Sequence, residues 1–327
     1  MNLAAGDLEA LWNRLSLAGR GARRFVTLRI DGAEPLDAHA ALRTADESPC
    51  LLFELSPGAA TRNLEFEAGG MRCTRSALEN GLCLVLSLED DDKRDLFGTL
   101  CADVLAYAAS EHATNRMEAV ILRLEAWRAF LRSTGGSMTR SETIGLMGEL
   151  HVLKALLEKK PSLLDTWRAP DDAIHDFEHL GLALEVKTTL GPGSRITIAN
   201  LDQLDDAGLE RLSLVHVHLY ETPDGECLDD LTATISSALC DAEARRWFSS
   251  ALLRRGLSPD DQRARAGIRA CVKQVHVHPV TQGFPRVLRG DVSSAIVDAS
   301  YMIELSHLRS TAEPWAAVLD SFITRRQ

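Results

Sequence analysis

The chain has 327 residues, 45% of them apolar, which is enough to bury two cores or one large one. No apolar run approaches the roughly 20 residues of a membrane-spanning helix, and no signal-like segment opens the chain, so we expect a cytoplasmic protein. The formal net charge of −11 argues against a protein that coats nucleic acid nonspecifically, because lysine and arginine drive such binding. The seven cysteines form no CxxC pair, which argues against a disulfide framework or a zinc knuckle.

The first third of the chain predicts a short helix followed by an antiparallel sheet. The helix is expected at residues 7–17, where the pattern is amphipathic. Apolar stretches separated by turn residues then predict five strands, at Arg24–Ile30, Cys50–Leu55, Thr61–Glu67, Met71–Ser76 and Leu82–Leu88. Apolar residues at helical spacing predict two further helices, about Lys93–His112 and Asn115–Arg132.

A run of small residues at 133–137 is the best internal boundary. We therefore expect a β-rich N-terminal domain at residues 1–136, ending in the two helices, and a second domain at residues 137–327. The second domain has an α/β pattern. A capping box at Thr139 opens a helix that ends near Lys159. The later elements are expected as strands Ile174–Glu178 and Leu182–Thr188, a short helix Asn200–Asp206, a strand Leu212–Tyr220, a helix Leu231–Leu253, strands Val272–Val280 and Ile296–Leu305, and a helix Glu313–Arg325.

Two carboxylates and a lysine fall on the first two of these strands. Asp176 is expected at the end of the first strand. In the second strand apolar residues alternate with Glu185 and Lys187, which therefore share one face, and a hairpin can bring Asp176 beside them. Converging carboxylates suit a hard divalent cation, which can polarise a phosphate and activate water. Lys187 can orient that water or stabilise the developing charge.

A third acidic residue lies on the preceding helix. Glu149 lies at the edge of an apolar stripe of leucines on the helix. Burying a carboxylate there costs free energy unless it is paired or close to a cation. We therefore expect it to reach the metal site from the helix, as an auxiliary acid.

This order of features resembles the PD-(D/E)XK nuclease superfamily: a helix with Glu149, then Asp176, then Glu185-Val186-Lys187, then a helix and an apolar strand. The resemblance implies a restriction-endonuclease-like α-β-β-β-α-β core with a mixed sheet. It also implies Mg²⁺ (or Mn²⁺) held by Asp176, Glu185 and the carbonyl of Val186, and hydrolytic cleavage of DNA. The same residues are similar to PD-(D/E)XK proteins found beside restriction and phage-defence components.

The sequence departs from the superfamily pattern at one position, because Ile174-His175 precede Asp176 where the superfamily name has a proline. The chain also has no GxxxxGK[ST] motif, so it is not itself expected to hydrolyse nucleotides. A nuclease that works beside a separate ATPase or methyltransferase subunit, or as a homodimer, is compatible with these features.

A basic segment lies between residues 240 and 290, with ten basic residues against four acidic ones. Such a cluster favours a phosphate-facing surface, although a solvated helix face explains each arginine equally well. Arg195 ends a glycine-rich loop close to the expected site, and Gln203 lies in the short helix expected after that loop. The expected DNA-contacting residues are Arg195, Gln203, Arg245, Arg246, Arg254 and Arg255.

Two alternatives from other functional classes remain. A single E-x-K pattern is common, and Glu185 with Lys187 can be an ordinary ion pair on an exposed strand. Separately, the protein can keep the nuclease fold without the activity, as an inactive scaffold that binds DNA or partner proteins. The second alternative is a metalloprotein that holds zinc or iron through two histidine pairs, His216 with His218 and His276 with His278.

Overall fold

The structure is a computed structural model that describes residues 3–18, 23–34, 36–55, 64–78, 81–133, 137–308 and 313–324. Contacts divide the chain into two units. The first comprises Met1–Gly136 with Ser258–Asp260, and the second Ser137–Leu257 with Asp261–Gln327. Within these described ranges, no helix is both long and apolar enough to cross a lipid bilayer.

The first unit is built on an antiparallel sheet of six strands in the order β1-β2-β3-β6-β5-β4. The strands are β1 (Phe25–Arg29), β2 (Ala38–Arg43), β3 (Pro49–Glu54), β4 (Phe66–Ala68), β5 (Met71–Leu78) and β6 (Gly81–Leu88). Strand β2 was not expected, because its three alanines have low β propensity; its pairing with β1 and β3 outweighs that preference. Of the expected strand Thr61–Glu67, residues 61–63 lie outside the described residues, and β4 begins only at Phe66.

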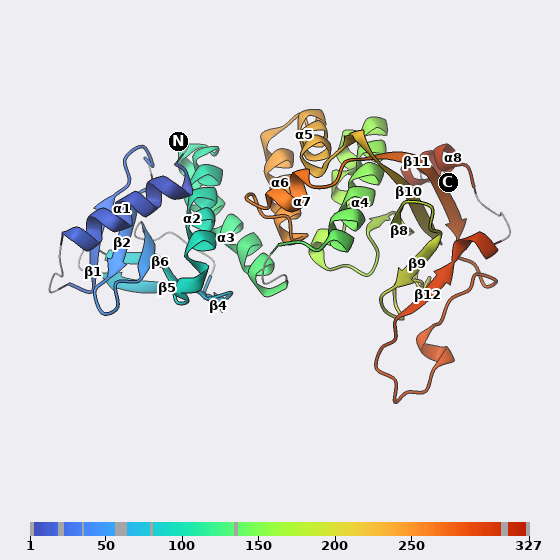
Figure 1. The fold of residues 1–327 in the computed structure, drawn as a ribbon, viewed down its shortest axis with the longest axis horizontal. Coiled ribbons are helices and arrows are strands. Elements are labelled where there is room, and N and C mark those ends of the chain that lie inside the picture. Colours follow the sequence, from blue (N-terminus) through green and yellow to red (C-terminus); the bar gives the residue numbers. More distant parts are fainter. Residues whose placement is uncertain are drawn as a thin grey trace. The chain divides into compact units, whose positions relative to one another are not determined.

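Three helices complete this unit, α1 (Ala5–Leu17), α2 (Arg94–Ala109) and α3 (Arg116–Ser133) (Figure 1). Trp12 of α1 is fully buried, and its indole N–H donates to the carbonyl of Cys50 on β3 at 3.0 Å. Its ring lies 5.4 Å from that of Phe97 on α2, measured between centroids. The burial of this one large side chain therefore fixes α1 against both the sheet and α2.

The second unit contains a mixed sheet of four strands in the order β11-β10-β8-β7. Strands β8 (Leu182–Leu190) and β10 (Arg211–Glu226) are parallel, while β7 (Phe177–His179) and β11 (Ala270–Pro279) pair antiparallel with their neighbours. A separate antiparallel pair is formed by β9 (Arg195–Ile198) and β12 (Tyr301–Glu304) (Figure 1). This mixed α/β architecture is compatible with the expected restriction-endonuclease-like fold.

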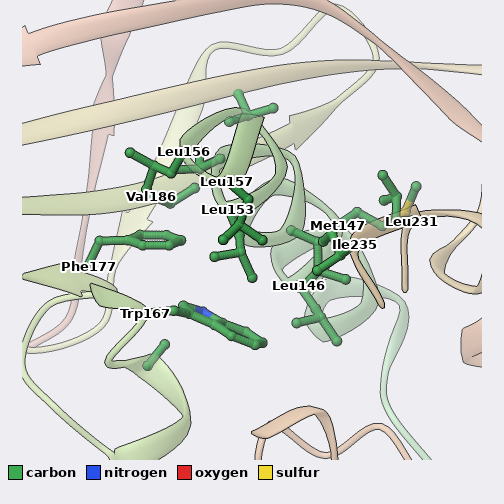
Figure 2. Close-up of a cluster of buried hydrophobic side chains, with 14 of the residues drawn as sticks. Leu146, Met147, Leu153, Leu156, Leu157, Trp167, Phe177, Val186, Leu231 and Ile235 are labelled. Atoms are coloured by element: carbon green, nitrogen blue, oxygen red, sulfur yellow. The ribbon is translucent and has the colours of Figure 1, made fainter. Parts of the chain in front are cut away.

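The helices of this unit are α4 (Arg140–Lys159), α5 (Leu228–Ala238), α6 (Ala242–Arg254), α7 (Gln262–Ala266) and α8 (Trp315–Ile323). The capping box that opens α4 forms as expected: Thr139 Oγ1 accepts from the backbone N–H of Glu142, whose carboxylate accepts from the N–H of Thr139. Figure 2 shows the core of the unit, in which Phe177 and Val186 of the sheet lie close to the leucines of α4.

Several element boundaries differ from the expectations. The stretch expected as a helix at residues 200–206 is a series of turns, because Asn200 Oδ1 accepts from the backbone N–H groups of Asp202 and Gln203 and replaces the helical pattern. The single helix expected at Leu231–Leu253 is two helices, α5 and α6. The second starts where Asp241 Oδ1 accepts from the N–H of Ala244 at 2.6 Å.

Three strands also differ. Strand β9 was not expected. The strand expected at Ile296–Leu305 is confined to β12, and the strand expected at Ile174–Glu178 begins only at Phe177. Asp176 therefore precedes β7 and does not end a strand. Its carbonyl accepts from the N–H groups of Arg168 and Ala169, so it is bonded to a turn and not to a strand partner.

Candidate active site

A tight hairpin places the three motif residues together. Strands β7 and β8 are joined by Leu180 and Gly181, which both have positive φ, at +50° and +85°. Positive φ at both positions is what a two-residue hairpin turn requires. The register pairs Phe177 with Leu184, so continuing the ladder by one residue puts Asp176 opposite Glu185.

Asp176 is held by the strand that carries the other two residues. Its Oδ2 accepts from the backbone N–H of Val186 at 2.7 Å. This bond fixes one carboxylate oxygen beside the peptide that links Glu185 to Val186. The carbonyl of Val186 was expected as a third metal ligand, and Val186 lines the same cavity as Asp176 and Glu185.

Glu185 and Lys187 form an ion pair inside the site. Lys187 Nζ lies 2.8 Å from Glu185 Oε1 and donates to Gln203 Oε1 at 3.2 Å. Gln203 Oε1 also accepts from the backbone N–H of Ala199, so the glutamine that contacts Lys187 is itself held by the backbone. Glu185 is 1% exposed, which is inconsistent with the alternative of a solvated surface ion pair.

Glu149 reaches the same cavity from α4, because that helix packs very closely on β8. A Cβ atom on Gly148 would lie 1.8 Å from Oγ1 of Thr188, so only glycine allows this approach. Glu149 is 4% exposed and is fully engaged: Trp167 Nε1 donates to its Oε2 at 3.0 Å, and the Arg255 guanidinium pairs with both of its oxygens.

The contacts of Glu149 with Trp167 and Arg255 were not anticipated from the sequence. Arg255 was expected only as a DNA contact, and it lies 106 residues along the chain from Glu149. No periodicity or short motif connects residues at such a separation, so only the folded chain shows this pairing.

A cavity of about 610 Å³ contains the site. Its walls include Glu149, Asp176, Glu185, Val186, Lys187, Arg195, Gln203 and Arg255, which are eight of the eleven residues singled out from the motif and its surroundings. The other three, Arg245, Arg246 and Arg254, do not line it. Arg245 donates to the carbonyl of Leu239, and Arg254 donates to the carbonyl of Pro170 and pairs with Asp171. These arginines stay predicted DNA contacts.

The carboxylates of the cavity repel one another, which makes it harder for Asp176 and Glu185 to be negatively charged. Burial, together with the carboxylates of Glu185 and Glu149, raises the pKa of Asp176 well above its usual value. Burial also raises the pKa of Glu185, although Lys187 opposes that effect. For Lys187, burial by itself would lower the pKa, but the charge of Glu185 and its hydrogen bond outweigh burial and raise it. Lys187 is therefore the charged partner of these acids.

These residues fit a divalent cation. Oε2 of Glu185 is buried and makes no hydrogen bond, so a buried carboxylate oxygen is left for another partner. The crowding of negative charge that raises the pKa of Asp176 is also what a divalent cation would relieve. Carboxylate and carbonyl oxygens are the donors that Mg²⁺ and Mn²⁺ prefer.

The four histidines lie in one row on β10 and β11. His216 is paired with His276 in the register, and the rings of His216 and His218 are stacked with centroids 6.0 Å apart. His216 Nε2 lies 2.8 Å from Oγ1 of Thr189, and His218 Nε2 is hydrogen-bonded to the carbonyl of Gly191. Within the described ranges, no three of these histidines bring their nitrogens to metal-ligand spacing, so the structure does not support the alternative of a histidine metal centre.

The described residues contain one cluster with metal-ligand spacing, and it lies in the first unit. Asp37, His39 and Glu54 bring three ligand atoms within 4.8 Å of one another. His39 Nε2 lies 3.3 Å from Asp37 and 3.5 Å from Glu54, and Asp37 also pairs with Arg29 at 3.0 Å. All three side chains are partly exposed, and they lie outside the cavity that contains the motif residues.

Comparison with known proteins identifies a family for the chain. A protein family described as "Putative PD-(D/E)XK family member (DUF4420)" matches residues 8–306. No curated protein and no solved structure matches the chain. The family match includes the whole constellation from Glu149 to Arg255 and most of both units. The chain therefore belongs to this PD-(D/E)XK family.

Proposed function

We propose that this protein is a metal-dependent endonuclease that cleaves DNA by hydrolysis of a phosphodiester bond. The observation that carries the proposal is the convergence of Asp176, Glu185 and Lys187 in one cavity of a chain that belongs to a PD-(D/E)XK family. Buried acidic groups with perturbed pKa values in a cavity are a signature of catalytic sites. The resemblance to proteins near restriction and phage-defence components supports a role as the nuclease of such a system.

Asp176, Glu185 and the carbonyl of Val186 are the residues that would hold the cation. When bound, Mg²⁺ or Mn²⁺ supplies a Lewis acid for the phosphate and lowers the pKa of a coordinated water. Asp176 is pre-oriented for this role by the N–H of Val186, which occupies one of its oxygens. Glu185 has one oxygen on Lys187 and the other without a hydrogen bond.

Lys187 acts as a phosphate stabiliser in this proposal. Its raised pKa keeps the ammonium charged at neutral pH, so it cannot remove a proton from water in the metal-free protein. A charged ammonium can instead hydrogen-bond the phosphate oxygens as negative charge develops on them. Gln203 and Glu185 both contact Nζ, and these two contacts restrict its position in the cavity.

A cleavage assay tests the proposal. Purified protein is incubated with supercoiled plasmid in Mg²⁺ or Mn²⁺, beside Asp176→Asn, Lys187→Met and the control Lys159→Met. Lys159 pairs with Asp320 on the surface and lies outside the cavity. We expect the wild type and the control to nick the plasmid and the two site variants to lose at least about 100-fold in rate. A wild type that binds Mn²⁺ but does not cut DNA by itself would indicate that a partner subunit is required. A folded wild type that neither binds Mn²⁺ nor cuts DNA would favour the inactive scaffold.

A further inference from the structure

The guanidinium of Arg255 is held by an acid of the site. This arginine follows α6 directly and pairs with Glu149 through Nε, 3.1 Å from Oε2, and through one terminal nitrogen on Oε1. A guanidinium has five N–H bonds, so this two-point pairing leaves three of them outside the contact with Glu149. The side chain is 32% exposed and lines the cavity, so it is accessible to a ligand there.

Glu149 is poorly placed to act as a metal ligand. Both of its oxygens accept hydrogen bonds, one from Arg255 and the other from Arg255 and Trp167. Glu185, by contrast, has a buried oxygen that makes no hydrogen bond. Bidentate arginine–carboxylate pairs have a fixed planar geometry, and the indole of a fully buried tryptophan holds the carboxylate in that plane. Glu149, which is itself oriented by Trp167, thus holds Arg255 in place.

A phosphate that enters the cavity meets several negative side chains, so a positively charged side chain in the cavity would favour its binding. Three carboxylates, of Glu149, Asp176 and Glu185, face the cavity that must admit a phosphate. Lys187 offsets Glu185, and Arg255 offsets Glu149. The charge of Glu149 raises the pKa of Arg255, so the guanidinium stays positive at any working pH. Its planar donors match the oxygens of a phosphate.

We propose that Arg255 binds a backbone phosphate of the DNA strand in the active-site cavity, and that Glu149 positions Arg255 and is not a metal ligand. This inference rests on the proposed function for the identity of the ligand, since DNA is the phosphate polymer that the site would cut. It assigns opposite roles to the two buried acids: Glu185 faces the metal and Glu149 faces an arginine.

The test measures DNA binding and metal binding separately from cleavage. Glu149 and Arg255 are replaced together by glutamines, which removes one negative and one positive charge and keeps hydrogen-bonding groups of similar size. Arg255→Lys keeps the positive charge but loses the planar set of N–H donors of the guanidinium. The control is the double variant Arg140→Gln with Glu221→Gln, because these two residues form an exposed arginine–glutamate pair of the same unit, outside the cavity. Thermal unfolding of each variant shows that it is folded.

Affinity for a labelled duplex is measured by fluorescence anisotropy in EDTA over a range of salt concentrations. We expect the double variant to bind about tenfold more weakly, with a slope of log K against log salt that is smaller by about 0.9, which is the loss of one phosphate contact. Arg255→Lys should weaken binding while keeping that slope. The control should change neither quantity by a comparable amount.

Affinity for Mn²⁺ is measured by calorimetry on the same proteins. We expect the double variant to stay within about threefold of the wild type, because the removed pair carries no net charge and no metal ligand. A loss of tenfold or more in Mn²⁺ affinity would make Glu149 a ligand and overturn the proposal. An unchanged duplex affinity and salt slope, an equal loss in the Arg140→Gln, Glu221→Gln control, or a wild type that binds no DNA would overturn it as well.

These outcomes are separable from failure of the proposed function. A wild type that binds DNA through Arg255 but cuts no substrate refutes the nuclease activity and retains the phosphate contact. A wild type that cuts DNA while the double variant binds DNA and Mn²⁺ normally retains the nuclease and refutes the role of Arg255.

Discussion

Replacing Asp176 by asparagine should make the metal-free protein more stable. Asp176 is a partly buried carboxylate beside Glu185 and Glu149, and these neighbours and burial raise its pKa well above the usual 3.8. Asparagine removes the charge and keeps an oxygen that can accept from the N–H of Val186. The gain should be about 2 kcal/mol, the typical cost of a poorly compensated buried polar group. For a unit of this size that corresponds to an increase in Tm of roughly 4–8 °C.

The sign of the effect depends on pH and on metal. An acid with a raised pKa binds more protons in the folded protein than in the unfolded chain, so stability falls as pH rises above about 3.8 toward the folded pKa. The advantage of Asp176→Asn in EDTA should therefore be small near pH 4 and grow toward neutral pH. With Mn²⁺ at 100 times its Kd, the free energy of unfolding of the wild type should rise by about 2.7 kcal/mol, and that of the variant should not. The wild type should then be the more stable of the two proteins.

The assay is thermal unfolding in EDTA and in Mn²⁺, between pH 4 and pH 8, beside the control Asp165→Asn. Asp165 is exposed in the same unit, and its replacement should change stability by less than about 0.5 kcal/mol. If Asp176→Asn lowers Tm in EDTA at pH 7, the carboxylate is stabilised by its surroundings and the reasoning from charge crowding is refuted. If Mn²⁺ stabilises the variant as much as the wild type, Asp176 is not a ligand.

Three further predictions follow from the packing and the charges. Gly148→Ala should destabilise the protein by about 1–3 kcal/mol in urea unfolding, because its Cβ would overlap Thr188; an unchanged midpoint would show that α4 can move off β8 freely. Leu180→Asn should raise stability by about 1 kcal/mol in the same assay, since asparagine tolerates a φ of +50° better than leucine, and a loss would mean that the leucine side chain matters more than the turn. Burial and three neighbouring histidines lower the pKa of His216 to about 4, so stability should fall as pH drops from 6.5 toward 4, by on the order of 1–2 kcal/mol after solvent screening. His216→Gln should flatten that part of the pH profile, and a profile identical to that of the wild type would contradict the lowered pKa.

The local elements of the site could be read from the sequence because their causes are local. The capping box at Thr139 and Glu142 involves hydrogen bonds over three residues, and it forms as expected. The alternation around Glu185 and Lys187 reflects the twofold period of a strand, which depends only on backbone geometry. That Asp176, Glu185, Lys187 and Glu149 line one cavity depends in addition on the close packing of α4 on β8, which is a tertiary contact.

The expectations failed where a contact between distant residues overrides a local preference. Strand β2 is rich in alanine and forms because β1 and β3 pair with both of its edges. The turns at residues 200–206 have a helix-like pattern, but the side chain of Asn200 takes the backbone N–H groups of Asp202 and Gln203. Arg289, 87 residues from Asp202, then pairs with both of its carboxylate oxygens and ties that turn to the C-terminal part of the unit.

The sequence by itself determined which side chains this protein offers for chemistry, because acids and a lysine at fixed spacing on a strand pair are a local property of the chain. Tertiary structure decided what each of them does. Glu149 and Glu185 are both buried acids of the same cavity, but one is held by Trp167 and Arg255 and the other keeps an oxygen without a hydrogen bond. That difference comes from residues 18 and 106 positions away from Glu149, at separations where a sequence carries no periodic signal and only the packed fold brings charges together.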